Sequence, residues 1–449
     1  MNNTRHGVLP RMTALGSLLL ALVGAPAHAE SAKIAEHAEG VAPEVARPRH
    51  LRMAVELAAV FAVGNRWYWR DEGKPNEVDW QLRGDSALQA KLGGLDAWRF
   101  DGNPYDINAL GHPGFGMLTH FLARENGYGV GQAFVISSLA SGAWETFLEL
   151  REYGSLNDMA TTSTAGVPLG EAAYQIVHHL RDTRFQLRGG MGTENGKAFG
   201  VTSAAGDLDL IPTRGSGTFR GGRHVSFVAE LPVDELGVRS YEGGAKTTVA
   251  GYYTNTDTEQ LVTGISAEFD YRKDAERDDR DWDLLTAVAV GPSIDYRVRH
   301  DSGLTIAVGA DLYVDFGMLK AKGFDAWRAT HPAERMRNTM EDRSHPYYFG
   351  VGASMDPRLN VVYGGLFAGA RISGAMFSSV DHADRDQEML STAVHFKDRD
   401  VNAALAAGYE QSGWSIMLDG RLRRRDGSAG GVDDVAGRRT AMLTVGVRR

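Results

Sequence analysis

The residues best suited to chemistry lie between positions 108 and 171, where histidine and carboxylate side chains gather. Within residues 131–153, a polar stripe runs along one side of a predicted helix, because its members follow one another at three- and four-residue spacing: Ser138, Ser141, Glu145 and Glu149. Most of their neighbours are apolar, and carboxylates beside an apolar surface are costly unless they are paired. This polar stripe therefore predicts partners from neighbouring segments.

The segments on either side of the stripe offer those partners. His120 and Arg124 lie four residues apart on the preceding segment, and His112 lies at its start. Asp158 and Glu171 follow the stripe. The functional interpretation is a polar pocket, able to bind a metal ion or move protons, that gathers His112, His120, Glu145, Glu149, Asp158 and Glu171.

Catalytic roles in such a pocket fall to His112, Glu145, Glu149 and Asp158. Either Glu145 or Glu149 would be the general base, with His112 as its partner or as a ligand. Cysteine is absent from all 449 residues, so a metal site would use histidine and carboxylates. The sequence leaves the metal and any other cofactor unknown.

The competing interpretation is structural. Arg124 then neutralises Glu145 or Glu149, while Ser155, Asn157 and Asp158 cap and turn the chain. We favour this interpretation, because internal ion-pair networks are common and perturb local charge as functional sites do.

The elements that position these side chains are predicted to be helices separated by Gly, Asn and Pro breaks. Pro113 and Pro168 lie near predicted helix starts, where the missing N–H of proline costs nothing. The predicted helices are 51–64, 113–126, 130–152 and 170–181.

A series of motifs across this region resembles a known family. The motifs are Asn108-x-x-x-His112-Pro113-x-x-Gly116, Ala123-Arg124-x-x-Gly127, Ser141-x-x-Trp144-Glu145-x-x-x-Glu149, Ser155-x-Asn157-Asp158 and Gly170-Glu171. Together they resemble the domain of unknown function 3943, over about residues 103–180. The resemblance implies an exported Gram-negative envelope protein with a helical core, often followed by β-rich sequence. It implies no established activity.

Beyond residue 184 the hydrophobic period changes from 3.6 to 2, which indicates strands. In Leu304 to Phe316 the even-numbered residues are apolar, while the opposite face carries Asp311, Tyr313 and Asp315. A strand that crosses an outer membrane needs ~9–11 residues of this alternation. Further predicted strands are Leu261–Tyr271, Asp281–Val298, Tyr347–Met355, Leu359–Ile372, Val401–Tyr409, Trp414–Leu422 and Thr440–Val447.

The predicted connections suggest a membrane barrel of ten to twelve strands, because long loops alternate with tight turns. The long loops are 272–283, 318–344, 378–387 and 424–438, and the tight turns are 300–303 and 356–360. The alternation breaks near 411–413, where two tight connections follow each other. A soluble β-sandwich or a lipocalin-like barrel is the alternative, and the terminal Arg448-Arg449 weighs against a membrane barrel.

The start of the chain and its charge bear on location and partners. Residues 1–29 read as a secretory signal peptide, with a basic start, a short apolar run and Ala27-His28-Ala29 as the cleavage pattern. Removing them changes the net charge from −9 to −11, which disfavours nucleic acid as a partner. No later apolar stretch is long enough for a membrane-spanning helix, so a membrane-inserted chain would cross as strands.

The fold class expected from these observations is α+β, with an N-terminal helical segment followed by an antiparallel transmembrane-type β-barrel. The domains are a signal peptide (1–29), a flexible leader (30–50), a helical domain (51–183) and the barrel (184–449). We expect an outer-membrane protein whose helices are periplasmic or inside the barrel.

The first hypothesis for its role is structural or lipid-handling, with outer-membrane lipid as partner. The alternative is an envelope hydrolase that uses the His/Glu/Asp cluster, and the third is a passive channel. The oligomeric state is left unknown.

Overall fold

The computed structural model describes most of the chain beyond residue 46. The predicted signal peptide and nearly all of the predicted leader lie outside the described residues, as do parts of several barrel loops. The described residues are 47–72, 87–101, 103, 105–149, 153–209, 221–234, 237–238, 240–256, 258–275, 282–331, 347–380 and 394–448.

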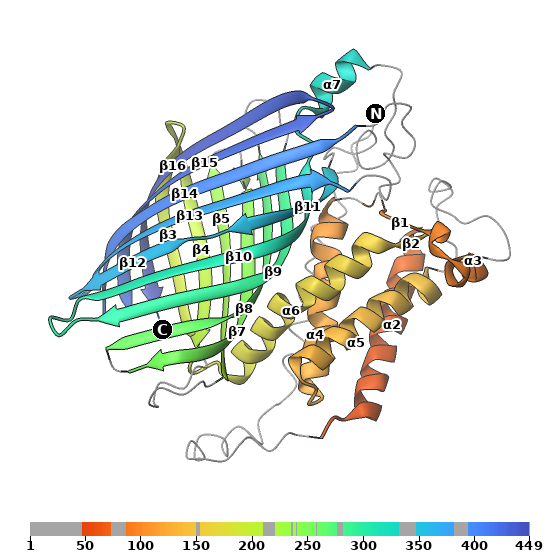
Figure 1. Ribbon diagram of the computed structural model, residues 1–449, viewed down its shortest axis with the longest axis horizontal. Helices are drawn as coiled ribbons and strands as arrows, with labels where there is room; N and C mark the ends of the chain where they lie inside the picture. The colour runs from red at the N-terminus through yellow and green to blue at the C-terminus, as the bar shows by residue number, and fades with distance from the viewer. Residues whose placement is uncertain are drawn as a thin grey trace. The chain divides into compact units, whose positions relative to one another are not determined.

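The helical segment precedes the barrel in sequence (Figure 1). Its helices are α2 (His50–Glu72), α3 (Ala87–Gly93), η2 (Leu95–Ala97), η3 (Ile107–Gly111), α4 (His112–Glu125), α5 (Val130–Ala143), η4 (Trp144–Leu148) and α6 (Leu156–His178). Two short strands, β1 (Trp98–Arg99) and β2 (Gly154–Ser155), pair in parallel. Among the described helices, none combines the length and the apolar character needed to cross a membrane.

Helix α6 differs from its prediction. It begins at Leu156 rather than at 170, because the Ser155 side chain accepts a hydrogen bond from the backbone N–H of Asp158 and caps the helix. Pro168 therefore lies inside the helix, where it removes one intrahelical hydrogen bond. Buried residues line α6 from Asn157 to Gln175, so packing along its whole length outweighs the local preference of proline.

The barrel strands form one closed antiparallel ring. They are β3 (Arg184–Glu194), β4 (Lys197–Asp209), β5 (Gly221–Asp234), β7 (Ser240–Asn255), β8 (Glu259–Ala275), β9 (Trp282–Arg299), β10 (Thr305–Lys320), β11 (Tyr347–Met355), β12 (Arg358–Tyr363), β13 (Leu366–Ser379), β14 (Phe396–Gln411), β15 (Trp414–Ala429) and β16 (Val432–Arg448). The last strand pairs with the first, and β6 (Gly237–Val238) pairs only with β5. Because β11 and β12 share one place in the ring, the barrel has twelve strand positions, which confirms the predicted fold.

Two predicted connections are wrong. Asp356 and Pro357 make no turn: they interrupt one strand position between β11 and β12, both of which pair with β10 and β13. The turn comes later, at Gly364-Gly365, where both residues have positive φ (56° and 89°), which costs glycine no strain.

The predicted loop 424–438 is also wrong, because β15 and β16 continue to a tight turn at residues 430–431. Strand β15 therefore has a tight turn at each end, at 412–413 and at 430–431. These two turns explain why the alternation of long loops and tight turns breaks near 411–413, and the barrel itself is regular there.

The two faces of the barrel wall differ as the strand pattern predicts. Apolar side chains on the outer face are solvent-accessible, among them Leu187, Met191, Ile265, Val308, Leu312, Val314, Ile372, Met376, Leu405, Leu418, Leu443 and Val445. The neighbouring inward residues Asp311, Tyr313 and Asp315 are buried.

Ion pairs bridge the barrel interior between strands that are far apart in the ring. Arg421 of β15 donates to Glu230 of β5 through two hydrogen bonds of 3.0 Å. Arg272 of β8 lies 3.1 Å from Asp400 of β14. Such pairs place side chains of opposite charge across the barrel interior.

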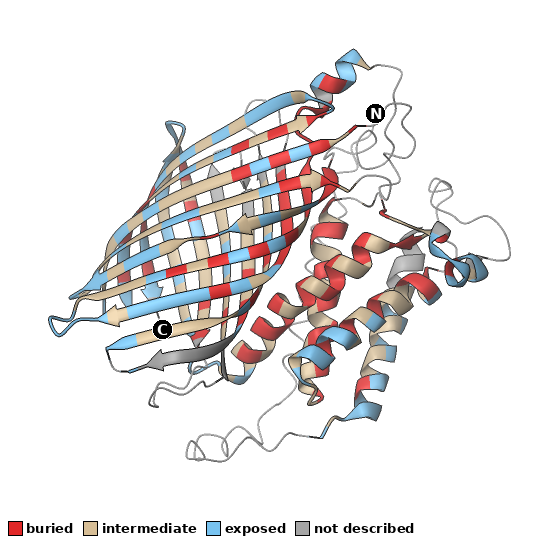
Figure 2. Ribbon diagram, in the orientation of Figure 1, coloured by how far each residue is buried: buried red, intermediate tan, exposed pale blue. Residues whose placement is uncertain are grey.

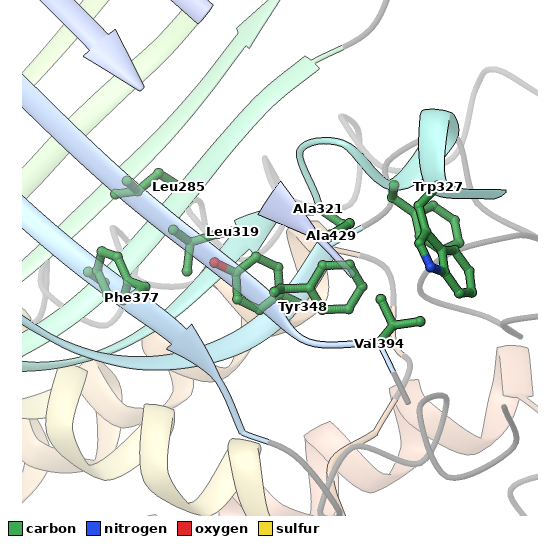
Figure 3. Packing of buried hydrophobic residues seen from close by; sticks show 11 residues of the cluster. Leu285, Leu319, Ala321, Trp327, Tyr348, Phe377, Val394 and Ala429 are labelled. Atoms are coloured by element: carbon green, nitrogen blue, oxygen red, sulfur yellow. The ribbon is translucent and has the colours of Figure 1, made fainter. Parts of the chain in front are cut away.

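One end of the barrel holds an apolar cluster. We call this the loop end: it is the end at which β10 finishes and β11 begins, and α7 (Phe324–Thr330) lies there (Figures 1 and 3). Figure 3 shows side chains of the strands and of α7 packed together, and the cluster comprises Leu285, Ala287, Leu319, Ala321, Phe324, Trp327, Tyr348, Phe377, Val394, Phe396 and Ala429.

Helix α6 packs against the outer face of the barrel wall. Ala165 belongs to one apolar cluster with Phe269 and Val288 of the wall, and Ala172 belongs to another with Val225 and Ala245. Figure 2 shows α6 largely buried between the wall and the other helices. Of the two positions expected for the helices, periplasmic or inside the barrel, these outer-wall contacts are incompatible with the second.

Helices α4 and α6 approach each other at glycines. A Cβ added to Gly116 would lie 1.8 Å from the carbonyl oxygen of Thr162, and one added to Gly166 would lie 2.8 Å from the carbonyl oxygen of Gly116. This close approach brings the polar residues of the two helices within hydrogen-bond distance of each other.

Candidate functional site

The first turns of α4 and α6 meet at a histidine and a carboxylate. His112 is the first residue of α4, and its Nε2 lies 3.2 Å from Oδ2 of Asp158 in the first turn of α6. The Asp158 side chain is 2% exposed and that of His112 is 16% exposed. The pair is therefore nearly enclosed, with the imidazole as its more accessible member.

A second aspartate, Asp101, completes this cluster. Asn157 Nδ2 donates to Asp101 Oδ1 at 3.0 Å and to Asp158 Oδ1 at 2.9 Å. Asn157 Oδ1 in turn accepts from the backbone N–H of Asp101 at 2.8 Å and from Ser155 Oγ at 2.9 Å. One asparagine therefore fixes the two carboxylates relative to each other.

Glu145 lies beside this cluster. Its Oε2 accepts from the backbone N–H of Ser155 at 2.8 Å. Lys91 donates to the carbonyl oxygen of Glu145 and, at 2.7 Å, to that of Glu149. The first contact holds η4 against the start of α6, and the Lys91 contacts join α3 to η4.

Glu149 and Ser141, also part of the predicted stripe, make separate contacts. The Glu149 carboxylate accepts from Trp144 Nε1 at 2.7 Å. Ser141 Oγ donates to the backbone carbonyl of Asp158 at 3.4 Å. The stripe therefore contacts the start of α6 through Ser141 and Glu145, while the carboxylate of Glu149 bonds within its own segment.

Burial dominates the electrostatics of this cluster. Burial lowers the pKa of His112 to about 4, although the charge of Asp101 opposes the shift. Burial also raises the pKa of Glu145 and of Asp158 well above the usual range, and neighbouring carboxylates add to both shifts. At neutral pH the imidazole is therefore uncharged, which is the form that binds a metal ion.

A second histidine–carboxylate pair lies further along the same two helices. His120 Nε2 lies 3.4 Å from Glu171 Oε2, and both side chains are fully buried. Arg124 Nε donates to the same oxygen at 2.8 Å, and Gln175 Nε2 donates to Glu171 Oε1 at 2.5 Å. The Arg124 guanidinium also lies over the ring of Tyr174.

The structure thus divides the residues predicted to share one pocket. His112, Glu145 and Asp158 lie together, whereas His120 and Glu171 form the second pair. Arg124 pairs with Glu171 and not, as the structural interpretation expected, with Glu145 or Glu149.

The first cluster touches the barrel wall through Asn108. Its Nδ2 donates to Asp101 Oδ1 at 2.5 Å and to the hydroxyl of Tyr347 in β11 at 3.0 Å. Tyr347 also donates to the backbone carbonyl of Asn103. Sequence reasoning missed Asp101, Lys91 and Tyr347. Asp101 lies just before the motif region, but nothing local to Tyr347 indicates a contact across more than two hundred residues.

The family comparison covers this helical segment. Residues 97–199 match the family model described as "Domain of unknown function (DUF3943)". The resemblance is confirmed. The DUF3943 segment contains both histidine–carboxylate pairs and ends within the barrel, in β4.

Solved structures similar to this chain are barrels. The NanC porin is 9% identical with a TM-score of 0.29, and the alignment covers 59% of this chain and 98% of that one. The KdgM porin is 8% identical with a TM-score of 0.23, covering 58% and 98%. The outer membrane protein Omp33 of Acinetobacter baumannii is 11% identical with a TM-score of 0.22, covering 59% and 98%. No curated protein shows significant sequence similarity to this chain.

Proposed function

We propose that this protein resides in the outer membrane, where the barrel spans the bilayer and the helices that precede it have a structural or lipid-handling role. The observation that carries the proposal is the apolar outer face of the closed barrel. Val314 is 74% exposed, Met191 71% and Leu418 60%. Apolar surface of this extent is rare on monomeric proteins in water, whereas lipid-facing barrel walls require it.

Aromatic residues support the same placement. Tyr296, Tyr363 and Trp414 are exposed near the barrel end opposite the loop end, beside the turns that connect β9 to β10, β12 to β13 and β14 to β15. Exposed aromatic side chains at a barrel rim are typical of the membrane–water interface.

The lipid-handling part of the proposal rests on α5. Its side chains Leu139, Val135 and Phe134 are 68%, 51% and 37% exposed. Because the helical bundle packs on the outer wall, this apolar face lies on the same side of the wall as the lipid-facing side chains. We therefore propose that lipid acyl chains cover α5.

Fractionation tests the membrane location. The full chain, expressed in a Gram-negative host, should sediment with the outer membrane and resist extraction by alkaline carbonate. Recovery in the periplasmic fraction without detergent would overturn the proposal.

Site-directed labelling tests the role of α5, and the absence of cysteine makes it straightforward. A fluorophore would be attached to Leu139→Cys on α5, to Leu418→Cys on the barrel wall and to Ser302→Cys in a turn. Nitroxide lipids should quench the first two similarly and the third weakly. If only a water-soluble quencher reached the label on α5, the lipid contact would be refuted while the membrane location stood.

The second candidate function is an envelope hydrolase, and the His112–Asp158 pair favours it. Glu145 and Glu149 are less suited to the role of general base than expected, because each carboxylate accepts a hydrogen bond from the protein. His112 takes that role in this proposal. Lipid extracts of cells that express the wild type or His112→Ala, compared by mass spectrometry, should then differ in a lipid species. Identical extracts would count against a lipid hydrolase.

The passive channel is the least supported role. The cross-interior pairs Arg421–Glu230 and Arg272–Asp400 and the apolar cluster at the loop end lie where a channel would need open space. We expect no conductance from the protein in planar bilayers.

A further inference from the structure

Three potential ligand atoms converge where α4 and α6 begin. One side-chain atom each from Asp101, His112 and Asp158 lies within 4.8 Å of the others. Two ligands bound to one cation at about 2.1 Å are about 3.0–3.4 Å apart for octahedral to tetrahedral angles. The 3.2 Å between His112 Nε2 and Asp158 Oδ2 falls in this interval.

The side chains around these atoms would favour a bound cation. The carboxylates of Asp101, Asp158 and Glu145 are all buried. The ammonium group of Lys91 is bound to the backbone carbonyls of Glu145 and Glu149. Carboxyl groups that crowd together in a buried site are unfavourable in their charged form, and a divalent ion between them would remove that cost.

A separate observation also points to a ligand. Asn108 is 1% exposed, and its Oδ1 has no hydrogen-bond partner. Its Nδ2 is bound to Asp101 Oδ1, and Asn108 lies one turn before His112. Buried polar atoms without a partner are rare, and an amide oxygen is a common ligand for divalent cations.

The residues around the ligands are arranged as metal sites require. Asn157 orients both aspartates, and Ser155 in turn bonds Asn157. Hydrogen bonds of this kind hold first-shell ligands in place. We propose that Asp101, His112 and Asp158 bind one divalent metal ion on the outer side of the barrel wall, beside the buried amide of Asn108.

The ligand types indicate the metal. A neutral imidazole with two carboxylates suits Zn²⁺ or Mn²⁺, whereas Mg²⁺ and Ca²⁺ prefer sites made of oxygen alone. Neither lipid contact nor catalysis is assumed, so this inference is independent of the proposed function.

The His120–Glu171 pair provides a matched control. It offers the same two ligand types on the same helices, but Arg124 already supplies its positive charge. A metal ion beside that guanidinium would meet a like charge, so we expect no metal at the second pair.

The test is a Zn²⁺ titration of the full chain in detergent, purified without a histidine tag and stripped with a chelator, in competition with a chromophoric zinc indicator. We expect one tight site per chain, at least tenfold weaker binding for Asp101→Asn and for His112→Ala, and affinity within twofold of wild type for His120→Gln. A Mn²⁺ titration followed by electron paramagnetic resonance should show the same ranking if manganese is the physiological ion.

Thermal melting separates lost binding from lost folding. Zn²⁺ should raise the Tm of the wild type and of His120→Gln, because a ligand that binds only the folded state stabilises it. It should leave the Tm of Asp101→Asn unchanged while that variant still melts cooperatively. The proposal is overturned if the wild type binds no metal, or if Asp101→Asn and His112→Ala bind Zn²⁺ as tightly as the wild type.

Discussion

The two histidine–carboxylate pairs between α4 and α6 use the same chemistry in different electrostatic settings. The nitrogen–oxygen distances are 3.2 Å for His112–Asp158 and 3.4 Å for His120–Glu171. At the second pair, Arg124 balances the charge of Glu171. At the first, further carboxylates surround the histidine. The comparison teaches that charge balance, rather than the presence of a histidine and a carboxylate, separates a structural pair from a candidate site.

The largest effect should come from removing the charge of Glu171. In Glu171→Gln the Arg124 guanidinium, only 11% exposed, loses its counter-ion. Breaking a buried pair in this way destabilises by about 3–5 kcal/mol. Urea unfolding followed by tryptophan fluorescence measures the change. The control is Glu125→Gln, which breaks the more exposed pair with His178 and should cost less than about 1 kcal/mol.

A smaller loss of stability, of about 1–3 kcal/mol, should follow Gly116→Ala. Gly116 lies midway between His112 and His120, and its added Cβ would force α4 away from the backbone of Thr162. Both pairs should therefore be disturbed, so weaker Zn²⁺ binding should accompany the lower stability. Gly131→Ala is the control, because nothing lies within 4 Å of its added Cβ. An unchanged Gly116→Ala protein would show that close helix contact does not set the geometry of the pairs.

The smallest loss of stability is expected at Asp158, and it distinguishes the two histidine–carboxylate pairs most clearly. Asp158→Asn removes one of several clustered carboxylates, and no arginine loses a partner, so we expect metal-free stability to change by less than about 1 kcal/mol. The increase in Tm on addition of Zn²⁺ should nevertheless disappear. If Asp158→Asn were as destabilising as Glu171→Gln in the absence of metal, the first pair would be a structural pair like the second.

The sequence predicted the barrel well because alternation is a local signal. The even-numbered apolar residues of Leu304–Phe316 face outward and the odd-numbered polar residues face inward, as expected. The predictions from sequence were wrong where packing in the folded chain outweighed the preferences of individual residues. Pro168 marks a helix start by its own preferences, yet packing against the wall carries α6 through it. The Asp356-Pro357 pair is typical of a turn, yet β10 and β13 hold it within one strand position.

The candidate site could be predicted only in part. Four-residue spacing correctly placed His120 and Arg124 on one helical face, and Ser155 is the helix cap that its position suggests. Spacing within one helix does not, however, determine which residues of another helix it meets. Arg124 meets Glu171 because glycines set how closely α4 and α6 approach, and this depends on the whole packed structure.

The account depends most on the helices packing against the outside of the barrel wall, because the lipid contact and the position of the metal site both follow from it. Adjacent residues of β7 allow a direct test: Ala245 packs with Ala172 of α6 on the outer face, whereas Lys246 points inward and pairs with Asp311. Ala172→Cys combined with Ala245→Cys should form a disulfide on mild oxidation in intact membranes. Ala172→Cys combined with Lys246→Cys should not, and cross-linking of the second combination alone would contradict the account.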